Sequence, residues 1–399
     1  MKMIRSSILL ALLLATGCLP ACVYPFEVGG VAEISPMLVV EGDIIVNGTT
    51  LVRLTRSTSL QESNPMIECD AQVFIEGEQG GRYPVLETAP GQYEAETSQL
   101  DPRQCYRLHL TLADQKQYVS AYVPVVVTPA IDSVGYSFHS DTTAMAIHVS
   151  THDAEGHARY YKWTYEETWE ITPSLLSSVL FDSEAKEYRF REAEESLHYC
   201  WTSRKSSGIL LGNTTRLAAD VIDKQVLLTI PERDMRAENL YCIQLTQMAL
   251  TQGAYIYWEN IRKNSEDVGG LFSPQPSEMV GNIYCLDQPD ELVLGYISAG
   301  TQTVSERKFI QGGLMRRVIR PACNCVEDIG YVDTRDIAKS FVFRDLGWMP
   351  MWAEYPADNV VIVSWHLPRC GDCRLWGGTK DRPSWWPNAH MYYTRIETR

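Results

Sequence analysis

The chain has 399 residues, of which 45% are hydrophobic, 21% charged and 10% aromatic. This balance supplies enough apolar side chains for large buried cores and excludes a disordered, collagen-like or coiled-coil chain. Acidic residues outnumber basic ones by 50 to 35, for a formal charge of -15. Because phosphate-binding surfaces need clustered Lys and Arg, this charge disfavours nucleic acid as a partner.

Residues 1–22 are typical of a bacterial lipoprotein signal and anchor. Lys2 and Arg5 make the start positive, an apolar run follows over residues 8–15, and Cys18 and Cys22 each follow a small residue. The run is shorter than the roughly 20 apolar residues that span a bilayer. We therefore expect lipidation of one cysteine, with several acyl chains holding the mature protein on a membrane.

Either cysteine can be the lipidated one. Cys18 follows Gly17 directly after the apolar run, whereas Cys22 follows Ala21 and has Leu19 three positions upstream. These local residues do not decide between them. If Cys18 carries the lipid, Cys22 stays in the mature chain and makes the count of remaining cysteines even, which slightly favours Cys18.

Short segments rich in β-formers begin after this signal, several with alternating apolar residues. Turn residues such as Gly80 and Gly91 separate them. The pattern predicts an immunoglobulin-like or transthyretin-like β-sandwich over residues 37–126.

A second β-rich domain is predicted over residues 130–318. It carries one prominent helix near residues 250–264, where Leu250, Ala254 and Tyr257 recur at helical spacing. Residues 181–195 are dense in charge, which favours a solvated insertion or edge. Residues 319–399 form a Cys- and Trp-rich C-terminal region, so the predicted fold is mainly β with a compact tail.

Disulfides are expected because an exported chain enters an oxidising compartment. Cys69 and Cys105 flank strands of the first predicted sandwich and are candidates for a bridge within it. The tail adds four candidates, which are Cys323, Cys325, Cys370 and Cys373. Four thiolates could instead bind zinc, but the C-x-C spacing departs from the usual C-x-x-C knuckle, so disulfides are favoured and no metal is predicted.

Motifs for catalysis are absent from the sequence, including G-x-S-x-G, H-E-x-x-H, the P-loop and G-x-G-x-x-G. His148 and His152 would lie about 13 Å apart along a strand, too far to share an ion. Glu166 and Glu167 are adjacent, and neighbouring carboxylates on a strand face opposite ways. We therefore predict no catalytic residues, no cofactor and no enzyme activity.

Three tryptophans of the tail, Trp376, Trp385 and Trp386, lie among Gly, Pro and Arg residues where loops are expected. Exposed aromatic rings can stack on a sugar or peptide. Packing over a small disulfide-linked tail is the alternative, and it is the favoured one.

Several strings, in this order, resemble an uncharacterised lipoprotein family of Gram-negative bacteria, catalogued as domain of unknown function 4249. They occupy residues 22–26, 37–42, 52–57, 89–93, 269–276, 281–283 and 293–299. The resemblance implies that the first cysteine of the C-x-x-P-F string, Cys22, is lipidated, which opposes the parity argument. It also implies an accessory role, because the family is similar in its setting to proteins found beside TonB-dependent outer-membrane transporters. It carries over no catalytic residue.

These observations lead to one functional hypothesis with one alternative. The first is a lipid-anchored outer-membrane protein that acts as a binding accessory beside a TonB-dependent transporter. The alternative is a free-standing structural or adhesive surface lipoprotein that binds glycan or protein. The sequence leaves the ligand and the face of the membrane undecided.

Overall fold

The structure is a computed structural model that describes residues 36–58, 65–138, 144–231, 234–266, 281–312, 329–357 and 360–387. The chain divides after Met37, and the contacts given below lie within residues 38–399. In the described residues strands account for 50% and there are two helices, which confirms the prediction of a mainly β protein. No helix in these ranges is long and apolar enough to cross a membrane. Cys18 and Cys22 lie outside them.

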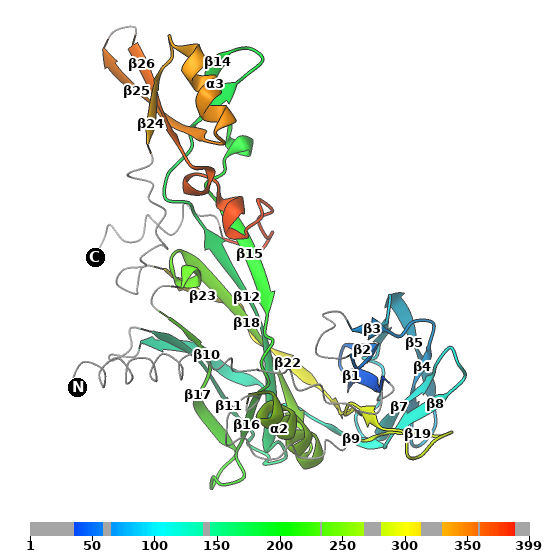
Figure 1. The fold of residues 1–399 in the computed structure, drawn as a ribbon. Helices are drawn as coiled ribbons and strands as arrows, with labels where there is room; N and C mark the ends of the chain where they lie inside the picture. Colours follow the sequence, from blue (N-terminus) through cyan, green and yellow to red (C-terminus); the bar gives the residue numbers. More distant parts are fainter. Residues whose placement is uncertain are drawn as a thin grey trace, which may run out of the picture. The chain divides into compact units, whose positions relative to one another are not determined.

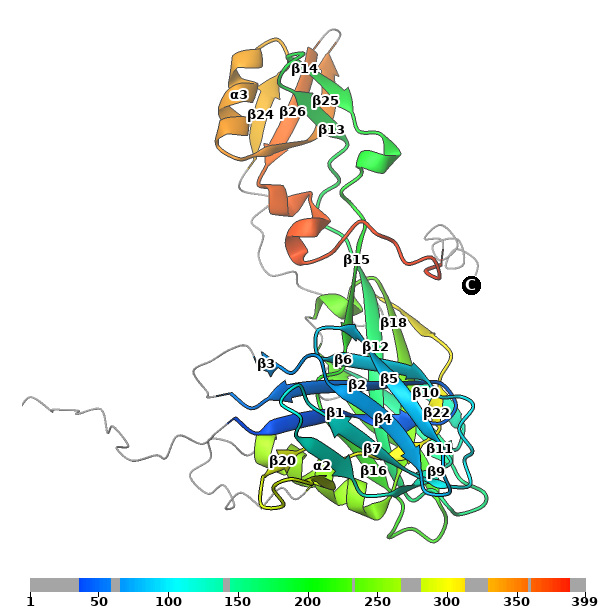
Figure 2. The same ribbon diagram turned by 90° about the vertical axis from the view of Figure 1, so that its right-hand side faces the viewer.

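Eight strands close into a mixed barrel (Figures 1 and 2). Their order is β7-β4-β5-β6-β2-β1-β21-β9, and β9 pairs back onto β7 at Cys105 and Tyr106. β21 runs parallel to both neighbours, while the other pairs in the ring are antiparallel. The strands are β1 (Leu38–Ile45), β2 (Thr49–Arg56), β4 (Gln72–Gly77), β5 (Arg82–Ala89), β6 (Gln92–Glu96), β7 (Cys105–Thr111), β9 (Val123–Val126) and β21 (Ala299–Gly300).

This barrel corrects the sandwich predicted over residues 37–126. A sandwich has two sheets with free edges, but here β21 joins β1 to β9 and closes the sheet. The closing strand comes from Ala299–Gly300, far beyond residue 126, so the first domain takes strands from two separate parts of the chain. Four short strands extend the same sheet: β3 (Met66–Ile67), β8 (Gln117–Ser120), β19 (Ile283–Cys285) and β20 (Val293–Leu294).

Alternation along the strands builds the barrel core. In β7 the fully buried side chains are Tyr106, Leu108 and Leu110, and the residues between them are only partly buried. The hydroxyl of Tyr106 donates a hydrogen bond of 3.0 Å to the carbonyl oxygen of Asp101. A large aromatic ring is therefore buried without leaving its polar atom unpaired.

Two sheets face each other in the second domain. One has the order β10-β11-β17, and the other has β12 and β18 at its centre. Both contribute to one apolar core, in which Ile147 of β11 and Ile222 of β17 join Trp163 of β12 and Leu245 of β18. The strands are β10 (Ile131–Phe138), β11 (Met145–His152), β12 (Tyr160–Ile171), β15 (Cys200–Lys205), β16 (Leu210–Asn213), β17 (Val221–Ile230), β18 (Leu240–Leu250), β22 (Gln302–Val304) and β23 (Lys308–Gln311).

The helix predicted near residues 250–264 is present as α2 (Gln252–Glu266). The Oγ1 of Thr251 accepts a hydrogen bond of 3.3 Å from the backbone N–H of Ala254, which supplies a partner for a free N–H at the helix start. Ala254 and Tyr255 pack with Met248 of β18. Burial of this face, as the periodicity predicts, attaches the helix to the second domain.

The C-terminal module consists of residues 179–190 and 330–366. Its sheet has the order β24-β26-β25, and Val363 and Trp365 of β26 point into its core with Phe343 of α3. The elements are β13 (Val179–Asp182), β14 (Glu187–Phe190), β24 (Gly330–Asp333), α3 (Ile337–Asp345), β25 (Met349–Ala357) and β26 (Val360–His366).

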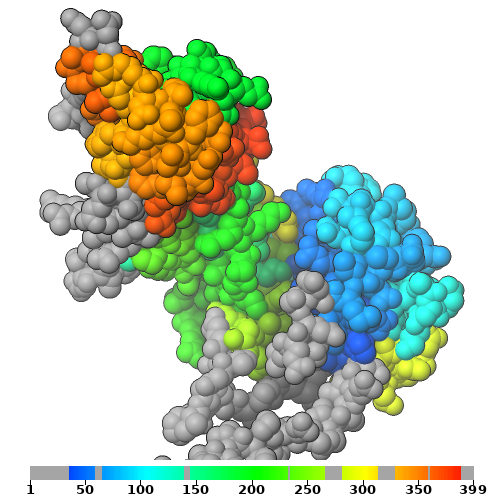
Figure 3. Space-filling view, turned by 45° about the horizontal axis from the view of Figure 1, so that its top comes forward, coloured from blue at the N-terminus to red at the C-terminus, as the bar shows by residue number. Residues whose placement is uncertain are grey.

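The charged segment 181–195 is exposed or half-buried throughout, which agrees with the predicted solvated insertion or edge, but part of it also packs on the module. Its strands β13 and β14 form a hairpin, and Phe181 and Tyr188 pack on Trp365 with ring centroids 5.9 and 6.3 Å away. Figure 3 shows the two parts of the module in contact, with the green surface of the hairpin region against the orange surface near residues 340–360. Two aromatic residues of the hairpin thus pack on the core of the module, while most of its charged residues remain exposed.

Candidate binding groove

The C-terminal module carries an open groove of about 320 Å³. Apolar side chains from the sheet, the hairpin and the start of α3 form its floor, and charged and aromatic side chains form its rim. The floor is Val179, Ile337, Ala353, Val361 and Val363. The rim includes Lys186, Glu187, Arg189, Phe190 and Tyr355. We call this the module groove.

The groove exists because the hairpin covers only one end of a sheet face. Val361, Val363 and Trp365 alternate along β26 and so share one face. The hairpin covers the Trp365 end, where the Trp365 Nε1 donates to the Tyr188 hydroxyl at 3.1 Å. At the other end Ala353 pairs with Val363 in the ladder, and both side chains line the open groove.

The rim presents large apolar rings beside paired charges. Phe190 is 63% exposed and Tyr355 is 64% exposed. Arg189 makes two 2.6 Å hydrogen bonds to the Glu195 carboxylate, and this pairing lowers the pKa of Glu195 to about 2. An apolar floor, exposed rings and a charged rim suit binding of a partner with apolar side chains. Among the described residues no group of three His, Cys, Asp or Glu side chains could hold a metal.

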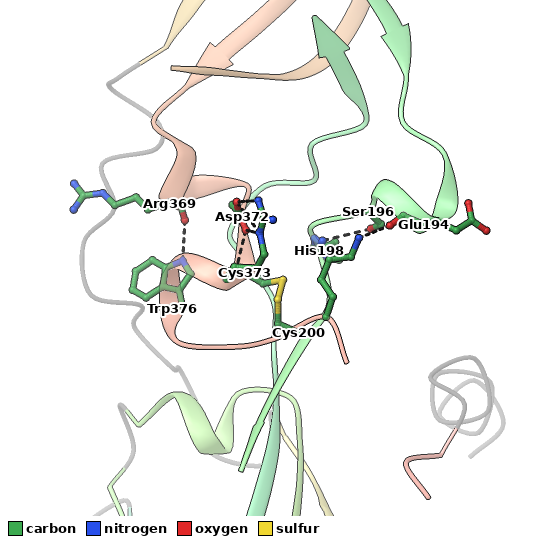
Figure 4. The surroundings of a disulfide bond; sticks show 10 residues. Glu194, Ser196, His198, Cys200, Arg369, Asp372, Cys373 and Trp376 are labelled. Atoms are coloured by element: carbon green, nitrogen blue, oxygen red, sulfur yellow. Dashed lines mark hydrogen bonds and ion pairs between the residues drawn. A yellow bond between two sulfur atoms is a disulfide. The ribbon is translucent and has the colours of Figure 1, made fainter. Parts of the chain in front are cut away.

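A disulfide between Cys200 and Cys373 connects β15 of the second domain to the chain just after the module (Figure 4). Their Cα atoms are 5.6 Å apart and they are separated by 173 positions in sequence. Cys373 was a disulfide candidate, but its partner Cys200 was not. Trp376, in the short 3-10 helix η4 (Cys373–Trp376), packs against this disulfide and donates from Nε1 to the Arg369 carbonyl at 2.8 Å.

The bridge predicted between Cys69 and Cys105 is not formed, because both are free thiols. Cys105 begins β7 and pairs with Pro124 of β9, whereas Cys69 lies near Glu87. Burial and the Glu87 carboxylate raise the pKa of the Cys69 thiol. Two cysteines that flank strands of one sheet are not brought together when each one contacts a different neighbour. Cys370 is also disulfide-bonded, and the candidates Cys323 and Cys325 lie outside the described residues.

The remaining two tail tryptophans pack on the second domain. Trp386 is 3% exposed, and its ring centroid lies 5.6 Å from Phe309 of β23. Trp385 lies 6.2 Å from the same ring, and the Arg307 guanidinium covers it at 4.2 Å. A buried ring offers no face to a ligand, so Trp386 is a packing residue and not the stacking site that its loop setting permitted.

The buried carboxyl of Glu170 gives a prediction about pH. Glu170 is 5% exposed, and burial raises the pKa of its carboxyl. Ionisation of Glu170 therefore opposes folding. This free-energy cost is absent when the pH lies below the pKa of the unfolded chain, about 4.3, and it is complete once the pH exceeds the pKa of Glu170 in the folded protein. We expect Glu170→Gln to raise the urea midpoint of unfolding at pH 7 and to change it little at pH 4. An equal gain at both pH values would contradict this assignment.

The sequence search missed a buried ionic cluster around Glu167. This side chain is fully buried and lies 2.6 Å from Arg204, 3.1 Å from Arg236 and 2.8 Å from the Tyr241 hydroxyl. Burial opposes the charge of Arg236, but Asp234 and Glu167 outweigh it and raise the pKa of the guanidinium. Alternation along β12 is the signal that was available: Glu167 follows Tyr161 and Trp163 on the inward side. All four polar groups are partnered, so the cluster offers no free reactive group.

Comparison with protein families finds one match. The family described as Domain of unknown function (DUF4249) matches residues 23–306, which is more than half of the chain. No curated protein matches the sequence. Part of the module groove, contributed by the hairpin, falls within the matched residues, and the part contributed by β25, β26 and α3 lies beyond them.

Proposed function

Because the chain belongs to the DUF4249 family, we propose that it is an outer-membrane lipoprotein that acts as a binding accessory of a TonB-dependent transporter. The lipoprotein signal with Cys18 and Cys22 supports lipid anchoring on that membrane. The disulfide between Cys200 and Cys373 suits an oxidising compartment outside the cytosol. The family setting described above supports the choice of partner.

The module groove is the observation that carries the binding role. Its apolar floor and the exposed rings of Phe190 and Tyr355 would be costly to leave in water without a partner. We propose that a loop or extended segment of the transporter inserts an apolar side chain into this groove and contacts the charged rim. The floor lies partly beyond the matched region, so this contact would distinguish the chain from relatives that share only that region.

Filling the groove tests this assignment. Ala353→Trp places a large ring over the floor, and we expect at least a tenfold loss of transporter recovered by the anchored protein, equivalent to about 1.4 kcal/mol. Val342→Trp is the matched control, because Val342 is 56% exposed on α3 and does not line the groove. Equal recovery by both variants would overturn the assignment of the groove.

A different result would favour the alternative function. If the native protein is recovered with its lipid but repeatedly without a transporter, the accessory role is wrong. A free-standing adhesive lipoprotein should then bind a glycan or peptide array, and Ala353→Trp should weaken that binding while Val342→Trp should not.

A further inference from the structure

One end of the barrel is the place where the chain enters the fold at Leu38. Four strands lie in register there, because Leu38 of β1 pairs with Val293 of β20 and with Arg56 of β2, and Arg56 pairs with Met66 of β3. Figure 2 shows β3, β20 and the start of β1 on the same side of the barrel. We call this the entry end. Its chain segments are residues 65–71, which include β3, and residues 90–91, 112–116 and 286–292.

The entry end exposes large apolar side chains. Met66 and Ile67 are each 55% exposed, Leu286 is 53% exposed and Leu292 is 70% exposed. The turns at the opposite end of the barrel, residues 78–81 and 97–104, are described in full and expose no large apolar side chain. A group of exposed apolar side chains confined to one end of a domain marks a contact surface.

The same end is acidic. Lys116 is the single basic residue of its four segments, and it pairs with Glu291 at 2.8 Å. The acidic residues of these segments are Glu68, Asp70, Asp114, Asp287, Asp290 and Glu291. Exposed carboxylates among apolar side chains repel an anionic surface and attract one that presents cations. The ammonium groups of zwitterionic phospholipids are such cations, and they lie directly above an apolar layer.

The chain reaches the entry end directly from the predicted lipid anchor. Leu38 follows Cys22 by 16 positions and Cys18 by 20 positions. Covalent geometry therefore limits the distance from the acylated cysteine to Leu38 to about 55 or 70 Å. A tether of this length raises the effective concentration of the entry end at the lipid surface, so a contact that is weak by itself becomes populated.

The segment 286–292 is fixed in place before any contact forms. The Leu286 N–H donates to the Gln117 carbonyl at 2.8 Å, and the Glu291 N–H donates to the Gln288 carbonyl at 2.9 Å. The Asp287 carboxylate also accepts from the backbone N–H of Gln117 at 2.8 Å. Because the segment is already ordered, binding through it costs little conformational entropy.

We propose that the entry end of the barrel contacts the bilayer, with Leu286, Leu292, Met66 and Ile67 inserted among zwitterionic headgroups. Insertion removes these side chains from water, and the carboxylates beside them meet the headgroup ammonium groups. The inference rests on the lipid anchor of the proposed function. It adds the surface that the anchored protein turns toward the lipid, which is separate from the module groove.

Photocrosslinking of the full mature lipidated protein tests this proposal. The vesicles contain phosphatidylethanolamine and phosphatidylcholine, with a phospholipid that carries a diazirine near the headgroup end of its acyl chain. We expect labelling of residues 65–71 and 284–292 and none of residues 78–81 and 97–104. Replacing half of the lipid by phosphatidylglycerol should lower this labelling at least threefold, because the carboxylates are repelled.

A double variant and a matched control locate the contact. Leu286→Glu with Leu292→Glu should lower the labelling of residues 65–71 at least tenfold, because charged side chains resist insertion. Val127→Glu should leave it unchanged, since Val127 is 61% exposed and follows β9, which lies level with the far end of β1. Both variants replace exposed side chains, so their urea midpoints should match that of the native protein.

The possible failures are distinguishable. If the N-terminal peptide is acylated but neither segment is labelled, the contact surface is wrong and the anchor stands. An N-terminal peptide without acyl chains would overturn the anchor and this inference with it. Stronger labelling in vesicles that contain phosphatidylglycerol would contradict the assignment to zwitterionic headgroups. Because Ala353 lies in the module groove, transporter recovery is tested separately.

Discussion

Glu167→Gln is expected to lower the free energy of unfolding by about 3 kcal/mol. The substitution keeps the shape of the side chain and removes only its charge, so Arg204 and Arg236 lose the carboxylate that lies between them. Breaking a buried pair costs about 3–5 kcal/mol because a charge is left uncompensated. We place the value at the low end because Arg236 keeps Asp234 at 2.6 Å and the Arg204 side chain is 55% exposed.

The neighbouring residue provides the control for this prediction. Glu166 precedes Glu167 on β12 but is exposed, so Glu166→Gln should change the free energy of unfolding by no more than about 0.5 kcal/mol. Urea unfolding of both variants at pH 7 measures the difference. Equal stability of the two variants would show that the cluster around Glu167 does not stabilise the fold.

Removal of the disulfide by Cys200→Ser with Cys373→Ser is expected to cost about 2–5 kcal/mol. The bridge closes a loop of 173 positions, and a crosslink between distant positions restricts the unfolded chain strongly. It also anchors the segment that follows β26, where the Cys373 N–H donates to the Leu197 carbonyl at 3.0 Å. Loss of the bridge should therefore increase hydrogen exchange in β24, β25 and β26 more than in the barrel.

Cys105→Ser is the matched control, because Cys105 is a free, partly buried thiol. We expect it to lower stability by no more than about 1 kcal/mol. Urea unfolding and peptide-level hydrogen exchange, without reductant, measure both effects. If the double variant unfolds at the same urea concentration as the Cys105 variant, the bridge contributes no stability.

Local patterns in the sequence predicted where the strands lie better than they predicted which strands pair with one another. The alternation of Tyr106, Leu108 and Leu110 predicts β7 directly, because every second side chain meets the core. β21 is only two residues long, too short for any alternation, yet it closes the barrel. Its position depends on the pairing of Ala299 with Ile44 across the chain, and a local pattern contains no information about such a contact.

The candidate site was less accessible to prediction for the same reason. The module groove combines Val179 from the hairpin with Ala353 and Val363 from β25 and β26, which lie more than 170 positions further along the chain. Cysteine spacing drew attention to Cys373 but not to Cys200, which has no neighbouring cysteine in sequence. Periodicity of apolar residues predicted α2 and its buried face, where only local spacing was needed.

Affinity purification of the natively anchored protein in mild detergent tests the central claim most directly, with mass spectrometry of the partners and of the N-terminal peptide. We predict recovery of a TonB-dependent transporter with the native protein and with Val342→Trp, its loss with Ala353→Trp, and an N-terminal peptide that begins at acylated Cys18 or Cys22. Recovery of the lipidated protein without a transporter, in repeated purifications, would contradict the accessory function.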